Sequence, residues 1–302
     1  MYKILVVLVL ILSWPPVWAK TPVTIIWPVG VGSTLLNYTR AIVNKANQDQ
    51  NQYNFFLEVK PGAGGAIGAT HAANMVNNGQ LALLSTTDAF FIRPLLVTSA
   101  TNYKIEDFQL VLPQASTPMS LVGKPGVSLE SLLHKPRSSI GTVGMGTGTH
   151  VMAEQIRLRA VDMIIIPFKD PPESVQQVIT GDLDLAWENL PLSLNNPRLQ
   201  IYGITGKTQV PGVKNLADLG FPFTGNLDIV SFIVAPKKLN AKQYSEIQNI
   251  LIQAQKTNKY LIDSIVANKG EAININVLQY HNWYNTRHRF FQDITRNIEQ
   301  VE

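Results

Sequence analysis

The sequence predicts an α/β protein in which parallel strands form sheets that are covered by helices on both faces. Three observations predict it. The chain has 302 residues, enough for about two domains. Short apolar runs rich in β-branched residues alternate with longer helical stretches. Glycine-rich turns occur three times where such a run ends and a helix begins. Apolar residues make up 45% and charged residues 15% of the chain, which excludes an intrinsically disordered protein.

The alternation runs twice along the chain. In the first half we expect strands at residues 23–27, 55–60 and 81–85, with helices at 34–46 and 66–75. The second half begins again with a strand at 139–142 and a helix at 149–159. A helix at 173–180 and strands at 163–167, 183–187, 201–205 and 228–235 follow. Everything after residue 235 has a helical pattern, and we expect the last helix to pack on its own domain. Its apolar stripe would also suit a partner helix or a membrane surface.

The N-terminus has the pattern of a signal peptide over residues 1–19, cleaved after Ala19. Lys3 precedes an apolar run at residues 4–12, and this run is too short to span a membrane, which takes roughly twenty residues. The chain has no cysteine, so disulfides, thiol catalysis and the lipid anchor of a lipoprotein are excluded. We therefore expect an exported, soluble protein.

Several function classes find no support. The net charge is +4 without a run of like charges, so nucleic-acid binding is not expected. None of the five histidines has a neighbour at metal-ligand spacing, and neither a phosphate-binding GxxxxGK[ST] motif nor a GxSxG nucleophile motif is present. We expect no catalytic residue, no metal and no cofactor.

The glycine-rich turns at residues 28–34, 61–65 and 144–149 carry the functional prediction. Glycine lets the backbone approach a ligand closely, and each following helix offers unpaired N–H groups that favour an anion. In an open α/β sheet the ligand binds beyond the carboxyl ends of the strands, where these turns lie. No turn contains an acidic or basic residue. We therefore expect a small carboxylate to bind better than its amino analogue.

Five sequence blocks, in order along the chain, resemble one family. The strongest is Lys60-Pro-Gly-Ala-Gly-Gly-Ala-Ile-Gly-Ala69, and the turn at 28–34 is similar to a P-x-x-P-G-G-S/T loop. Further matches are Thr142-Val-Gly-Met-Gly-Thr147 with His150, Ile166-Pro-Phe-Lys169, and residues 181–191. Together they resemble the periplasmic substrate-binding proteins of tripartite tricarboxylate transporters, the Bug family. The chain departs from the family pattern in lacking the first-loop Asp, with Met145 in place of Asn, Asp170 in place of Gly and Glu188 in place of Asp.

The resemblance implies a type II periplasmic-binding-protein fold, with two α/β domains and a ligand cleft between them. Residues 20–121 together with 231–302 would form the first domain, and residues 122–230 the second. The ligand-binding residues implied by the family or expected at the same edge are Val29, Gly30, Gly32, Ser33, Thr34, Ala63, Gly64, Thr86, Thr87, Thr142, Gly144, Gly146, Thr147, His150, Glu188 and Asn189.

The expected function is that of a periplasmic, monomeric receptor that captures a small carboxylate and delivers it to integral-membrane permease subunits. Two alternatives stay open: a ligand-binding component of a sensing system, and an exported hydrolase on a similar scaffold.

Overall fold

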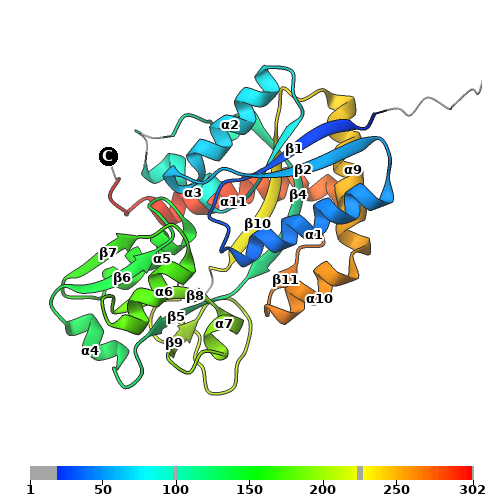
Figure 1. Cartoon of the computed structure of the whole chain (residues 1–302). Helices are drawn as coiled ribbons and strands as arrows, with labels where there is room; N and C mark the ends of the chain where they lie inside the picture. The colour runs from blue at the N-terminus through cyan, green and yellow to red at the C-terminus, as the bar shows by residue number, and fades with distance from the viewer. Residues whose placement is uncertain (1–18, 98, 100, 223–226, 301–302) are drawn as a thin grey trace, which may run out of the picture.

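The computed structural model describes residues 19–97, 99, 101–222 and 227–300, which form two lobes (Figure 1). Each lobe contains one mixed sheet with helices packed on it. The expected signal peptide lies outside the described residues, apart from Ala19. Within the described part of the chain, no helix is both long and apolar enough to cross a membrane.

The first lobe is built on a six-stranded sheet with the strand order β11-β4-β10-β3-β1-β2. Strand β1 (Thr21–Trp27) lies between and parallel to β2 (Tyr53–Val59) and β3 (Ala82–Thr87). Strand β10 (Ile229–Pro236) pairs antiparallel with both β3 and β4 (Phe108–Thr117), and the two-residue β11 (Glu271–Ala272) closes the edge. The sheet is therefore mixed, because a strand from late in the chain inserts between two early ones.

The helices of the first lobe cover this sheet through their apolar faces. They are α1 (Thr34–Asp49), α2 (Ala66–Asn77), α3 (Ala89–Leu96), α9 (Ala241–Thr257), α10 (Lys259–Ala267) and α11 (Tyr280–Thr295). Helix α1, for example, buries Leu35, Tyr38 and Ile42, which lie at three- and four-residue spacing. The last helix packs on its own lobe, as expected, where Tyr284 and Phe291 of α11 contact Phe91 of α3.

The second lobe is built on a five-stranded sheet with the order β7-β6-β8-β5-β9. Its strands are β5 (Met119–Gly123), β6 (Ser138–Thr142), β7 (Met163–Pro167), β8 (Leu185–Asn189) and β9 (Gln200–Ile204). Strands β7, β6 and β8 are parallel, whereas β5 pairs antiparallel with both β8 and β9. The helices are α4 (Leu129–His134), α5 (Gly148–Arg157), α6 (Pro171–Thr180) and α7 (Leu190–Leu194).

The chain crosses between the sheets twice. It leaves the first sheet after Thr117 and enters the second at Met119, and it returns between Ile204 and Ile229. The expected boundary between residues 121 and 122 is therefore placed too late, because Leu121 pairs with Trp187 inside the second sheet. The return boundary at 230/231 similarly falls inside β10. Strands β4 and β5 were not predicted from the sequence. The sequence pattern predicted parallel sheets, whereas both sheets contain antiparallel pairs as well.

Candidate functional site

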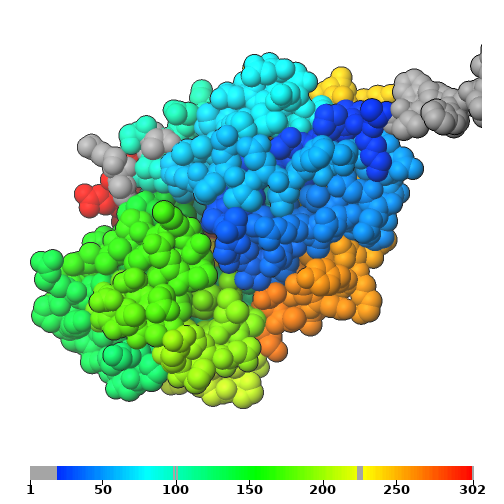
Figure 2. All heavy atoms as spheres, viewed as in Figure 1, coloured from blue at the N-terminus to red at the C-terminus, as the bar shows by residue number. Residues whose placement is uncertain are grey.

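Three glycine-rich loops from the two lobes meet in the structure, and we name them by their order in the chain. The first loop (residues 28–33) follows β1, the second (60–65) follows β2, and the third (143–147) follows β6. A Cβ atom added to Gly64 would lie 2.7 Å from the carbonyl oxygen of Met145, and one added to Gly144 would lie 3.7 Å from the Gly64 Cα. The second and third loops are thus in contact. Figure 2 shows the green second lobe packed directly against the blue part of the first.

The first loop and Thr34, the first residue of the following helix α1, each contact the second lobe. A Cβ on Gly30 or Gly32 would lie 3.1 or 3.0 Å from a carboxylate oxygen of Asp170, which also caps helix α6 by accepting a hydrogen bond from the Glu173 amide. Asn189, at the end of β8, donates a hydrogen bond to the Thr34 hydroxyl at 3.0 Å. The neighbouring first-loop residues are half-buried Val29, which packs on the core, and Ser33, whose side chain does not cap α1.

The second loop has a left-handed backbone that only glycine adopts easily. The φ angles of Gly64 and Gly65 are 57° and 100°, and Ala63 has a φ of 49° although it carries a side chain. Two separate constraints therefore require glycine at position 64: the backbone conformation and the facing Met145 carbonyl. This local geometry explains the glycines in the sequence block at residues 60–69.

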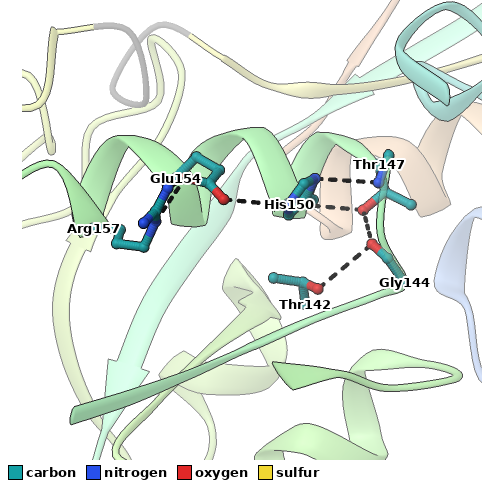
Figure 3. Close-up of polar contacts among 7 residues, drawn as sticks. Thr142, Gly144, Thr147, His150, Glu154 and Arg157 are labelled. Atoms are coloured by element: carbon teal, nitrogen blue, oxygen red, sulfur yellow. Dashed lines mark hydrogen bonds and ion pairs between the residues drawn. The ribbon is translucent and has the colours of Figure 1, made fainter. Parts of the chain in front are cut away.

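The third loop is held by its own side chains (Figure 3). The Thr147 hydroxyl donates to the Gly144 carbonyl at 2.9 Å and accepts from the His150 amide at 3.3 Å, which caps α5. The Thr142 hydroxyl also reaches the Gly144 carbonyl, at 3.5 Å. Thr142 and Thr147 thus fix the loop backbone, and neither hydroxyl is free of an internal partner.

His150 lies beneath the third loop and is completely buried. The Gly146 amide donates to its Nδ1 at 3.2 Å, which places the ring proton on Nε2, 3.5 Å from a carboxylate oxygen of Glu154 (Figure 3). Burial raises the pKa of Glu154, but the neighbouring His150 ring and the Arg157 guanidinium, which donates to the carboxylate, outweigh it, so this pKa lies below its usual value. The His150 ring therefore holds the third loop in place. The Gly146 N–H already donates to this ring in the present structure.

Thr86 and Thr87 end strand β3, one strand away from the first loop. Thr86 is buried, and its hydroxyl donates only to the Thr87 carbonyl, at 3.4 Å. Both residues pair with β10, opposite Phe232 and Ser231. Among the described residues, neither hydroxyl forms a hydrogen bond to one of the three loops.

Two carboxylates of the second lobe belong to this region: Asp170, which lies against the first loop, and Glu188, which precedes Asn189 at the end of β8. Glu188 is 5% exposed and accepts a hydrogen bond from the Asn189 amide at 2.7 Å. Burial raises the pKa of Glu188 to about 7, and the negative charge of Asp170 acts in the same direction. The three loops lack acidic residues, but the site as a whole does not. The preference for a carboxylate over its amino analogue therefore stays a prediction, because each of these two carboxylates is a group that accepts hydrogen bonds from an ammonium group.

Sequence reasoning missed Arg93 on helix α3. Its guanidinium Nη1 donates to the Met145 carbonyl at 2.7 Å and lies 2.7 Å from the position of a Cβ on Gly64, so it lies between the second and third loops. The signal in the sequence is a single basic residue within the otherwise apolar stretch at residues 89–96. In the part of the chain that the structure describes, no group of three metal-ligating side chains comes together.

Two mixed α/β lobes, joined by two crossings and meeting through glycine-rich loops, define a periplasmic-binding-protein fold. Residues 39–296 match the family model described as the tripartite tricarboxylate transporter family receptor, so the chain belongs to this family of solute-binding receptors. The resemblance noted in the sequence is confirmed.

Individual relatives agree with this assignment. The chain is similar to Protein BugT of Bordetella pertussis, with 28% identity over 227 residues that cover 68% of this chain and 69% of that protein. The solved structure of the periplasmic binding protein BugD matches with a TM-score of 0.81 at 17% identity, covering 92% of this chain and 97% of that one. R. palustris Rpa4515, solved with adipate, matches with a TM-score of 0.80 at 17% identity and the same coverage. These structures confirm the type II fold with two α/β lobes. The family is one of receptors, so the hydrolase alternative loses its support.

Proposed function

We propose that this chain captures a small carboxylate between its two lobes in the periplasm and delivers it, as a monomer, to a membrane permease. The observation that carries the proposal is the meeting of glycine-rich loops from both lobes at the carboxyl ends of their strands. A relative of the same fold has been solved with adipate, a dicarboxylate.

The chemistry of the loops supports an anionic ligand. The amides of Gly32 and Gly144 donate no hydrogen bond within the described part of the chain, and both belong to loops that lead into helices. Unpaired N–H groups at helix N-termini favour negative charge. Carboxylates bound by such amides gain charge-assisted hydrogen bonds, which are about twice as strong as neutral ones.

The contacts between the lobes imply that they move. Gly64 touches Met145 and Thr34 is hydrogen-bonded to Asn189, so these contacts close the route between the loops. Entry of a ligand therefore requires the lobes to separate, with the two crossings as hinges. Thr205 links the crossings, because its hydroxyl accepts from the Met119 amide at 2.8 Å and donates to Asp228 at 3.1 Å.

Calorimetry with succinate, malate and adipate, each beside its neutral diamide, tests capture. We expect at least one carboxylate to bind at micromolar affinity and to be recovered unchanged, as seen by NMR. Binding of none of them, or their conversion into a product, would contradict the proposal.

Delivery needs a test in cells. Deleting the gene should abolish uptake of the radiolabelled ligand while leaving the transcriptional response to that ligand intact. Loss of the response with uptake preserved would instead support the sensing alternative.

A further inference from the structure

Arg93 is the one lysine or arginine among the described residues that is buried, with 5% of its surface exposed. Its Nε is completely buried and has no hydrogen-bond partner within the described residues. Nη1 has one partner, and this is the neutral carbonyl of Met145 at 2.7 Å. A buried cation is costly unless it is paired and fully hydrogen-bonded, so this arrangement is incomplete without a further acceptor.

Within the described ranges of the chain, no acidic side chain supplies that acceptor. Among the described residues, Arg93 forms no salt bridge, whereas the partly buried Arg287 holds Asp88 through two hydrogen bonds. Burial lowers the pKa of the Arg93 guanidinium, yet an arginine stays protonated at neutral pH. The positive charge is therefore present and has no negative partner among the residues that the structure describes.

The position of Arg93 sets it apart from a buried structural arginine. A Cβ on Gly64 would lie 2.7 Å from its Nη1, and a Cβ on Gly146 would lie 3.1 Å from its Cα, so the residue touches both the second and the third loop. Met145 belongs to the other lobe, so separation of the lobes removes the one partner that Nη1 has in the described part of the chain. The guanidinium then faces the opening between the lobes.

The charges of the site are divided between its two sides. Asp170 lies against Gly30 and Gly32 of the first loop, and its charge also acts on Glu188. An incoming carboxylate is repelled on that side and attracted on the side of Arg93. The charge distribution thus favours a ligand that binds with its carboxylate on the side of Arg93.

We propose that Arg93 is the residue that pairs with the ligand carboxylate and so determines the specificity of the site for an anion. This inference rests on the proposed capture of a carboxylate and names the group that recognises it. Because the guanidinium presents paired N–H donors in a fixed plane, it can hold a carboxylate through two parallel hydrogen bonds.

The test compares charge discrimination in the wild type and in Arg93→Gln. Affinities for adipate and succinate are measured beside those for their neutral diamides. The variant should lose roughly tenfold to a hundredfold in carboxylate affinity, the range expected for a charge-assisted hydrogen bond, with diamide affinity unchanged. Arg40→Gln is the matched control, because Arg40 is exposed on α1 and its guanidinium donates a hydrogen bond to Asn37 of the same helix.

The outcomes separate this inference from the proposed function. Equal loss of affinity for carboxylate and diamide would show that Arg93 only holds the lobes together through Met145, and would overturn the inference. Retained carboxylate affinity in the variant would overturn it as well. If the wild type binds no carboxylate at all, the proposed function fails first.

A measurement on the wild type covers the case in which Arg93→Gln does not fold. The ¹H–¹⁵N resonance of the Arg93 Nε, assigned by its absence in Arg93→Lys, should shift on addition of adipate and stay in place on addition of the diamide. An Nε resonance that does not respond to adipate at saturation would overturn the inference.

Discussion

Glu188 is a buried carboxyl group, and its surroundings disfavour the charged form. Burial raises its pKa to about 7, with Asp170 adding to the effect and the Asn189 amide opposing it. The folded protein therefore binds more protons at this position than the unfolded chain does between about pH 4.5 and pH 7. The contribution of Glu188 to the free energy of unfolding is therefore fully present below the pKa that the carboxyl has in the unfolded chain. This contribution is lost as the pH rises through about 7.

Replacing Glu188 by glutamine should remove this pH dependence. The variant keeps an oxygen for the Asn189 amide and has no charge to bury. We expect Glu188→Gln to be more stable than the wild type by roughly 1–3 kcal/mol at pH 8, with no difference at pH 4. Urea unfolding at both pH values measures the difference in the free energy of unfolding, with Glu130→Gln, at an exposed carboxylate, as the control. An equal difference at the two pH values would contradict the assigned cause.

Gly64 permits the second loop to approach the third. In Gly64→Ala the added Cβ would lie 2.7 Å from the Met145 carbonyl, so the lobes could not close to the present distance. Gly79→Ala is a matched control, because Gly79 has a φ of 80° but no atom within 4 Å of an added Cβ. Both variants should lose about 1 kcal/mol of stability through backbone strain. Gly64→Ala alone should lose at least tenfold in carboxylate affinity by calorimetry, and equal affinities would remove this loop from the site.

At the scale of elements, an ion pair joins α11 to the first lobe in addition to its aromatic contacts with α3. Arg287 of α11 donates to both carboxylate oxygens of Asp88, which is 1% exposed and also accepts from the Val230 amide at 3.0 Å. The pair joins the C-terminal helix, the start of α3 and the return crossing into β10. It therefore holds a late segment of the chain against an early one.

Removal of Arg287 should destabilise the protein strongly. Arg287→Ala leaves the Asp88 carboxylate buried with a backbone amide as its partner, which costs about 3 kcal/mol. Arg296→Ala is the control, because its pair with Asp293 on the same helix is exposed and contributes under about 1 kcal/mol. Chemical unfolding of both variants measures the difference. Similar midpoints for the two would show that the buried pair does not hold the helix.

Elements with regular patterns were predictable from sequence, and the crossing strands were not. The apolar run at residues 23–27 and the glycines after it specify β1 and the turn into α1 by local rules alone. Strand β4, in contrast, contains Gln109, Pro113 and Gln114, which interrupt an apolar run. Its pairing with β10 joins residues that are more than a hundred positions apart, so no local signal specifies it.

The same distinction applies to the site. The loops were predictable because glycine spacing reports backbone geometry directly. Arg93 and Asp170 were not, because each comes from an element outside the loops and reaches the site through the approach of the lobes. Charged side chains that lie outside the sequence motif of a site can be assigned to it only from a three-dimensional structure.

At the scale of the whole molecule, the two lobes should open and close. Contacts such as that between Arg93 and Met145 exist in the closed arrangement, and a ligand touching both lobes stabilises it by its differential affinity. Small-angle scattering should therefore show a smaller radius of gyration with saturating carboxylate than without it. An unchanged profile under proven binding would contradict closure around the ligand.

The central claim, that this receptor captures a small carboxylate, has one most direct test. The protein is purified under native conditions without refolding, and native mass spectrometry measures the mass and composition of the ligand that it retains. We predict a small organic acid, bound one per chain and released from Arg93→Gln. A retained ligand without a carboxyl group, such as a sugar or a simple amine, would contradict the account.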